Sequence, residues 1–466
     1  MNQIMLKLLD SWSNREGNVN STKELLDWIQ QLNETTQVEI KETSVNEDSF
    51  WFYDDYRGEI LNRKRSFFSI VGVRYFENEE FVTEQPIILQ KEIGYLGIIA
   101  KEINGVLNFL MQAKIEPGNV NCVQISPTIQ ATKSNFTRAH GGRLPFYFEY
   151  FEKASQNGKV LYDQIQSEQG SRFDGKRNRN IILLIDKEIP VYDNYRWMTL
   201  GQIKELMAID NLVNMDTRTV LSGIPFVTYH VNDETCKEME EFFKDKALMK
   251  SIFATNVSDS LSKITPIIND YKMFCDVERI MVPLNQLVDW KVTDYGIHCK
   301  KDADFSVGYY DIHINGREVQ HWLQPLFKAN KEAMFALFTC VEEGVRKFLI
   351  TVKPEIGCFD KAEFGPTIQE GITLGRKDDI ELALYKVINN HLQNKRGIMK
   401  DVILSEEGGR FYHEQNRNVI IEIEKSELPE LPVNYVWVDY CCLNYLVQVN
   451  NVLNIQLRNL MSLIDL

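Results

Sequence analysis

Apolar residues recur along this chain at two spacings, one helical and one alternating, so the sequence predicts both helices and strands. Ser21-x-x-Glu24 has the pattern of a capping box, and apolar residues at helical spacing follow it. A helix is therefore expected to begin directly after Ser21. Residues 199–208 and 215–221 are expected to form two further helices.

Apolar runs without helical spacing predict strands. Residues 106–115 and 120–125 are expected to be strands joined by a turn at Pro117-Gly118-Asn119. Residues 180–185 are expected to be a buried strand, and residues 158–170 to contain another strand or a short helix. Because regular helices do not separate these strand runs, the pattern favours an α+β fold over a doubly wound sheet.

A polar segment occurs twice. SEQGSRF at residues 167–173 returns as SEEGGRF at residues 405–411, and over 14 residues the two windows share 8 identities. Ordinary composition would give about one identity. Core packing alone would not specify these polar and glycine residues, so the repeat bears on architecture or on ligand binding.

Other matches keep nearly the same step along the chain. Trp51 and Trp290 are 239 residues apart, Gln85-Pro86 and Gln324-Pro325 are also 239 apart, and Arg218 and Arg458 are 240 apart. This period is far longer than a solenoid repeat, so it predicts two tandem copies of one fold. We expect the first copy to span residues 1–228 and the second residues 229–466, with a linker between residues 225 and 276.

The charge balance excludes some classes of protein. The net charge is −14 and the pI about 5.2, which argues against a nucleic-acid binder or a basic membrane-surface protein. The eight cysteines include no CxxC pair, which is typical of reduced cysteines in the cytoplasm. The start of the chain lacks the pattern of a signal peptide, and the strongly apolar residues 181–185 are too few to span a membrane. We therefore expect a cytoplasmic protein that binds neither nucleic acid nor membrane.

The two copies differ most after their shared Pro-Thr-Ile-Gln segment, where the first copy has a loop rich in donors at residues 131–142. Charged side chains and glycine N–H groups of this kind suit a phosphate or diphosphate, and a polar surface loop is the alternative. His140 lies beside two glycines and could take part in chemistry, or be a hydrogen-bonded structural histidine. Trp51 and Trp290 could stack on a nucleobase, and core indoles are the alternative.

Long segments of the chain resemble the NDP-hexose 2,3-dehydratases. They include QAKIEPGN at residues 112–119, SPTIQAT at residues 126–132, SNFTR at residues 134–138, NMDTRT at residues 214–219 and SEEGGRFYH at residues 405–413. The resemblance implies two Nudix-like domains from gene duplication, a homodimer, and two nucleotide-sugar pockets per subunit, one of them catalytic. The implied substrate is dTDP-4-keto-6-deoxyglucose. This family usually has an aromatic residue where the chain has Arg172.

On this resemblance we expect the first copy to be catalytic, because its loop has the richer set of donors. The expected catalytic residues are His140 as acid or base, Lys133 at the ketone or a phosphate, and Glu149. The expected substrate-binding residues are Trp51, Ser134, Asn135, Phe136, Thr137, Arg138, Gly141, Gly142 and Arg172. The expected residues of the second pocket are Trp290, Gln369, Arg410 and Asn416.

No cofactor or metal is expected, because the elimination needs no redox group and the chain lacks the glutamate-rich box of Nudix hydrolases. Two alternatives remain open at this point. One is a non-catalytic nucleotide-sugar binding protein, and the other is a metal-dependent nucleotide-sugar hydrolase.

Overall fold

The computed structural model describes residues 2–136, 144–226, 239–253, 256–316, 319–371 and 378–466. Its first part contains α1 (Asn2–Ser13), α2 (Thr22–Thr35), β1 (Val38–Thr43), β2 (Trp51–Asp54), β3 (Glu59–Asn62), β4 (Ser69–Glu77), β5 (Glu80–Leu89), β6 (Gly94–Ile103), β7 (Val106–Ile115), β8 (Val123–Ser126), β9 (Ile129–Ala131), α3 (Lys133–Phe136), α4 (Phe148–Glu152), α5 (Ala154–Asn157), β10 (Lys159–Ser167), β11 (Arg177–Ile185), β12 (Tyr195–Thr199), α6 (Leu200–Met207) and α7 (Met215–Ser222).

The second part contains α9 (Lys246–Phe253), α10 (Val257–Phe274), β13 (Val277–Val282), η1 (Leu284–Gln286), β14 (Trp290–Thr293), β15 (Gly296–Cys299), β16 (Phe305–Ile314), β17 (His321–Ala329), β18 (Ala333–Glu342), β19 (Val345–Pro354), β20 (Ala362–Pro366), β21 (Ile368–Gln369), α11 (Asp379–Asn394), β22 (Ile398–Ser405), β23 (Phe411–Tyr412), β24 (Gln415–Glu422), η2 (Lys425–Glu427), β25 (Tyr435–Asp439), α12 (Tyr440–Leu446) and α13 (Ile455–Leu463).

Local sequence signals account for several of these elements. Ser21 caps α2 through a capping box in which its side chain accepts from the N–H of Glu24, as expected. The strand expected at residues 106–115 is β7, and residues 158–170 contain the strand β10. The strand expected at residues 120–125 begins only at Val123, because Cys122 has a φ of 63° and cannot be part of an extended strand.

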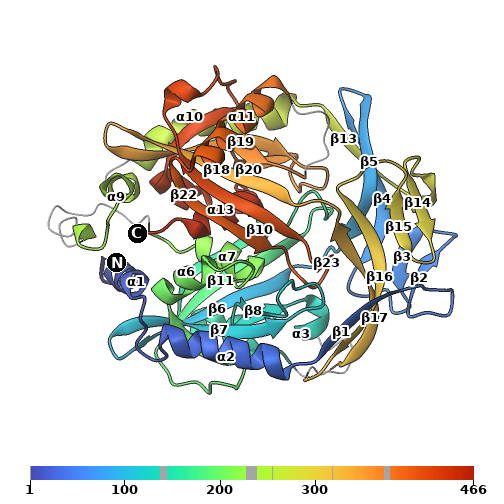
Figure 1. Ribbon diagram of the computed structural model, residues 1–466, viewed down its shortest axis with the longest axis horizontal. Helices are drawn as coiled ribbons and strands as arrows, with labels where there is room; N and C mark the ends of the chain where they lie inside the picture. The colour runs from blue at the N-terminus through green and yellow to red at the C-terminus, as the bar shows by residue number, and fades with distance from the viewer. Residues whose placement is uncertain (1, 137–143, 227–238, 254–255, 317–318, 372–377) are drawn as a thin grey trace.

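The expected α+β class is confirmed, with four sheets among the described residues. A seven-stranded sheet contains β6 to β12 of the first copy, and another contains β18 to β22, β24 and β25 of the second. Both pack against a shared core that includes residues of α1, α6, α7, α12 and α13. The outer face of the first large sheet is covered by α4 and α5, and that of the second by α11. Figure 1 shows the smaller sheets gathered at one side of the molecule.

The two copies exchange their leading strands. β1 pairs antiparallel with β16 of the second copy, and β13 pairs antiparallel with β4 of the first. β1 and β13 start at Val38 and Val277, which are 239 residues apart, so the exchange is reciprocal. The tandem copies predicted from the repeat are thus joined by hydrogen-bonded strands as well as by the chain between them.

The repeated polar segments make a second reciprocal contact. Gly357 N–H donates to Gly170 O at 2.7 Å, and Gly118 N–H donates to Gly408 O at the same distance. A Cβ atom on Gly118 would lie 1.6 Å from Phe411 O, and one on Gly357 would lie 1.9 Å from Phe173 O. Each copy's repeated turn therefore docks on a glycine turn of the other copy, where a side chain would not fit.

Helix α10, within the stretch expected to link the copies, packs against β19, β20 and β25. The expected boundary at residues 228/229 lies outside the described residues. No helix in the described part of the chain combines the length and the apolar character needed to cross a membrane.

The strand exchange yields a prediction about fragments. Residues 1–228 and 229–466, produced separately, should each fail to give a folded monomer, because each lacks a strand of its own smaller sheet and exposes an unpaired edge. Mixed during refolding, the two fragments should assemble into a 1:1 complex of native size. Size-exclusion chromatography with circular dichroism measures this, and two independently folded fragments would contradict it.

Candidate functional site

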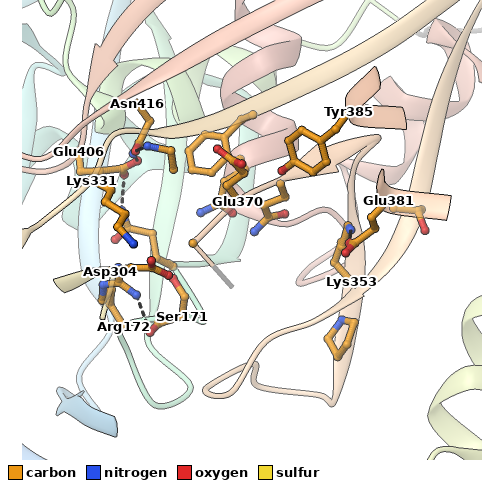
Figure 2. Close-up of a pocket in the computed structure, with 18 of the residues that line it drawn as sticks. Ser171, Arg172, Asp304, Lys331, Lys353, Glu370, Glu381, Tyr385, Glu406 and Asn416 are labelled. Carbon is orange, nitrogen blue, oxygen red and sulfur yellow. Dashed lines mark hydrogen bonds and ion pairs between the residues drawn. The ribbon is translucent and has the colours of Figure 1, made fainter. Parts of the chain in front are cut away.

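A cavity of about 640 Å³ lies in the second copy, a size suited to a nucleotide-sized ligand. Its walls come from the starts of β18 and β24, the end of β19, Gln369 of β21, and α11. The first copy also contributes, because the turn carrying Gln169, Ser171 and Arg172 closes one side. Figure 2 shows Arg172 beside Asp304 and Lys331, across the site from Tyr385 and Lys353.

Arg172 is buried in this wall. Its side chain is 5% exposed, its guanidinium lies 4.1 Å from the ring centre of Phe305, and Nη2 is 4.0 Å from Glu414 Oε1. Arg172 was expected in the first copy's pocket, and this location is wrong. The turn that carries it crosses to the second copy, since Gly170 O is bonded to Gly357 N–H.

Arg410, which belongs to the second copy, extends into the first copy. It was expected in the second pocket, but Nη1 donates to Gln90 of the first copy at 2.6 Å, and Nε donates to Glu407 at 2.8 Å. Its guanidinium lies 5.0 Å from the ring centre of Phe173, also of the first copy. Arg172 of the first copy thus lies in the wall of the second copy's cavity, and Arg410 of the second copy lies among residues of the first.

Two buried carboxyl groups give the second cavity its acid–base character. Glu406 accepts from Asn416 Nδ2 at 2.6 Å and also from Gln169 Nε2. Burial, and then the charge of Glu414, raise the pKa of Glu406 to about 7. Burial likewise raises the pKa of Glu414. On the opposite wall Lys353 forms an ion pair with Glu381 at 3.1 Å.

The same polar frame is present in both copies. In the second copy Gln369 donates to Glu355 at 3.2 Å and accepts from Asn454 at 2.8 Å. In the first copy Gln130 donates to Glu116 at 3.3 Å and accepts from Asn214 at 3.2 Å. The bond from Asn416 to Glu406 corresponds to one from Asn178 to Glu168 at 2.5 Å. The first copy thus presents the same arrangement of side chains at the corresponding place.

The expected members of the second pocket are partly brought together. Gln369 and Asn416 line the cavity. Trp290 is 6% exposed, donates from Nε1 to Glu84 O at 2.9 Å and packs on Phe305. Trp51 is 3% exposed and packs on Phe68. Both tryptophans thus have the setting of core indoles, the alternative that the sequence left open.

The donor-rich loop is only partly described. Lys133 and Asn135 are exposed in α3, and Asn135 Oδ1 accepts from Thr132 Oγ1 at 2.7 Å. Phe136 stacks on Phe148 with ring centres 5.4 Å apart, and Glu149 is exposed in α4. Thr137, Arg138, His140, Gly141, Gly142 and the side chain of Ser134 lie outside the described residues. The roles expected for these residues stay predictions.

One group of described residues has the composition of a metal site. Asp311, His313 and His321 have possible ligand atoms within 4.8 Å of one another. The two imidazoles are stacked with ring centres 3.8 Å apart, and His321 Nε2 lies 2.6 Å from Asp311 Oδ1. Both histidines are exposed, and the three residues are not part of the cavity wall, so this group has no evident part in the site.

Comparison with known proteins identifies the family of this chain. The profile of the NDP-hexose 2,3-dehydratases matches residues 22–224 and again residues 261–464. The chain belongs to the NDP-hexose 2,3-dehydratase family. The two matched segments correspond to the two copies inferred from the repeat and are consistent with tandem domains.

Three relatives of this chain have the same name. A dTDP-4-dehydro-6-deoxy-alpha-D-glucopyranose 2,3-dehydratase from Saccharopolyspora spinosa is 37% identical over 89% of this chain and 85% of its own length. Enzymes of that name from Streptomyces violaceoruber and Amycolatopsis orientalis are each 32% identical. Those two alignments cover 93% and 95% of this chain, and 95% and 90% of the respective relatives.

Sequence reasoning missed the crossing of the two arginines and the buried acids beside them. The available signal was the repeat itself, in which glutamate and arginine recur in a segment with no apolar periodicity. The sequence could not reveal that each repeated turn serves the opposite copy, because that depends on contacts more than 180 residues apart.

The buried acids predict a pH-dependent stability. Burial, and then the charge of Glu363, raise the pKa of Glu355 from 4.5 to about 8. Between pH 4.5 and pH 8, Glu355 is protonated in the folded protein but ionised in the unfolded chain. The stabilisation that Glu355 contributes at low pH is therefore lost as the pH rises from 4.5 to 8. Glu355→Gln should therefore melt progressively higher than wild type as the pH rises from 5 to 8. Thermal unfolding measures this, and a pH-independent difference would contradict it.

Proposed function

We propose that this protein removes water from dTDP-4-keto-6-deoxyglucose and releases the 3,4-diketo-2,6-dideoxy sugar, a step in deoxysugar biosynthesis. The observation that carries the proposal is the match of the 2,3-dehydratase family over both copies of the chain. Relatives named for this activity at 32–37% identity support the same substrate. The cavity adds a site of suitable size with cationic side chains for an acidic ligand.

The chemistry of the elimination defines what the site must supply. The C-4 ketone acidifies the proton at C-3, so a base can remove it to give an enolate. A donor must stabilise the developing charge on the C-4 oxygen, and an acid must protonate the departing C-2 hydroxyl. General acid–base catalysis of this kind contributes about 10²–10⁴-fold, and an oxyanion donor on the order of 10²–10³-fold.

We assign nucleotide-sugar binding to the described cavity and to the corresponding place in the first copy, with Arg172 and Arg410 as buried cations in the two walls. We retain the first copy as the catalytic one. In it, Ser134, Asn135, Thr137 and Arg138 would hold the diphosphate, with Lys133, His140 and Glu149 as candidates for proton transfer or for binding the C-4 oxygen. Phe136, packed on Phe148, would form an apolar wall of that site.

The finer description of the protein is also part of this proposal. Each copy would have a Nudix-like fold, with the boundary between copies at residues 228/229. The protein would be a cytoplasmic homodimer that uses neither cofactor nor metal. A non-catalytic binding protein and a metal-dependent nucleotide-sugar hydrolase are the two alternatives, and the following experiment distinguishes both from a dehydratase.

Purified protein should convert dTDP-4-keto-6-deoxyglucose in deuterium oxide containing a metal chelator, with solvent deuterium incorporated during turnover and the C-2 oxygen lost. Proton and carbon NMR measure both changes. Thermal stabilisation by the substrate without product would favour the binding protein. Magnesium-dependent release of a sugar phosphate would favour the hydrolase.

His140→Gln should lower turnover at least about 10-fold, because the variant side chain cannot carry the proton or positive charge that the imidazole supplies. The dissociation constant for dTDP should change less than 3-fold, because the nucleotide is held by other residues. His298→Gln, at an exposed histidine of β15, is the matched control. Steady-state kinetics and calorimetric titration measure the two quantities, and full turnover by His140→Gln would remove this residue from the mechanism.

A further inference from the structure

The two copies share a polar frame but differ in two side chains that face it. In the second copy, Gln456 and Gln169 line the cavity. By the internal repeat, Gln456 corresponds to Asp216 and Gln169 corresponds to Glu407. The second copy's site thus has two amides where the first copy's site has two carboxyl groups.

The equivalence holds in three dimensions. Asp216 and Gln456 both follow an N-cap asparagine, Asn214 or Asn454, in the first turns of α7 and α13. Both asparagines donate to the frame glutamine of their own copy, Gln130 or Gln369. Asp216 therefore sits relative to the first frame as Gln456 sits relative to the second.

Glu407 reaches the first copy by the crossing already described. It lies in the turn whose Gly408 O is bonded to Gly118 N–H, and it holds Arg410 through Nε at 2.8 Å. Its other oxygen accepts the N–H of Gly409 at 3.0 Å. Gln169, its counterpart, lies in the equivalent turn and donates to Glu406. Glu407 is thus a carboxylate that the second copy contributes to the first copy's site.

Asp216 has the properties of a group kept protonated. It is 2% exposed, and its Oδ1 has no hydrogen-bond partner among the described residues. Burial, then the charges of Glu168, Glu407 and Glu116, raise its pKa well above the usual value, against the opposing charge of Lys114. At neutral pH such a carboxyl group can give up a proton.

Glu407 is poised differently. Burial raises its pKa to about 7, while the hydrogen-bonded Arg410 opposes the shift and favours the ionised form. Two carboxyl groups whose environments separate their protonation states are the usual signature of an acid and a base in one site. Gln169 and Gln456 can do neither, so the second copy lacks this pair of carboxyl groups. Its own buried Glu406 does not replace the pair, because it corresponds to Glu168, which the first copy also has.

We infer that Glu407 is the base that removes the C-3 proton and that Asp216 is the acid that protonates the departing C-2 hydroxyl. Of the two roles proposed above for Lys133 and His140, binding of the C-4 oxygen then remains. This inference rests on the proposed dehydratase function. The electron pair of the C-3–H bond first forms the C-3=C-4 enolate. When the C-4 carbonyl re-forms, the electron pair of the C-3=C-4 bond forms C-2=C-3 and the C-2–O bond breaks. The hydroxyl leaves as water with the proton of Asp216. The enol left at C-3 tautomerises to the ketone by losing the proton of its hydroxyl and gaining a proton at C-2. Proton exchange with solvent returns each carboxyl group to its starting state.

The proposed active site takes residues from both copies. Asp216 comes from the first copy, and Glu407 with Arg410 comes from the second. Lys176 of the first copy stands where the second copy has Glu414, so the first site also gains a cation. Its pKa is lowered to about 8 by burial and by Arg410, and it suits charge that develops on the C-4 oxygen.

The test uses full-length Asp216→Asn and Glu407→Gln. Turnover should fall at least about 100-fold in each, because one of two proton transfers is lost, while dTDP still raises the melting temperature. Asp216→Asn should retain exchange of the C-3 proton with deuterium oxide without losing water, and Glu407→Gln should lose both. Glu363→Gln is the matched control, because Glu363 is also buried, bonds to Ser167 at 2.6 Å and corresponds to Gln124 in the first copy. It should keep turnover within about 3-fold of wild type.

The outcomes are separable. An active wild type whose Asp216→Asn and Glu407→Gln variants turn over like Glu363→Gln would overturn the assignment and leave the dehydratase function intact. A wild type without dehydratase activity would overturn both. If a variant does not fold, the wild-type pH profile decides. Turnover must fall as the pH drops below about 7, because Glu407 gains a proton there, so a flat profile from pH 5 to 8 would overturn the assignment.

Discussion

The close approach of two backbone turns across the interface between the copies constrains the whole structure. Gly118 and Gly357 each bring an N–H within 2.7 Å of a carbonyl in the opposite copy, at a separation that excludes a side chain. These contacts place the repeated turns, and the turns place Arg172, Arg410, Glu406 and Glu407. The site therefore depends on how the two copies meet as well as on the fold of either one.

Beside the shared apolar core, the interface between the copies also buries charged groups, and this has an energetic cost. Buried arginine Arg218 satisfies part of its charge by donating to Ser405 O at 2.8 Å, and Arg458 makes the equivalent bond to Ser167 O. Burial raises the pKa of the carboxyl groups of Glu355 and Glu406, which favours their uncharged, protonated forms. Such groups contribute little to stability, so their presence in the frame is better explained by ligand binding and proton transfer.

Features that depend on neighbouring residues could be predicted from the sequence, whereas features that depend on contacts between the two copies could not. The cap at Ser21 and the strand Val106–Ile115 depend on neighbouring residues and on one packed face, and both were predicted correctly. Gln369 and Asn416 line the cavity of the second copy, the copy to which the repeat assigned them. Arg172 and Arg410 were assigned to the wrong copies, because a repeat shows which residues correspond but not which copy they serve.

The reciprocal exchange of β1 and β13 also has an evolutionary consequence. A single ancestral module whose first strand added to another molecule's sheet would have been a domain-swapped homodimer, with two identical composite sites. Fusing the two genes would have freed each site to change alone while the shared interface kept both folded. One site could then exchange two carboxyl groups for amides and still be retained, because removing its half of the protein would take away residues that the surviving site needs.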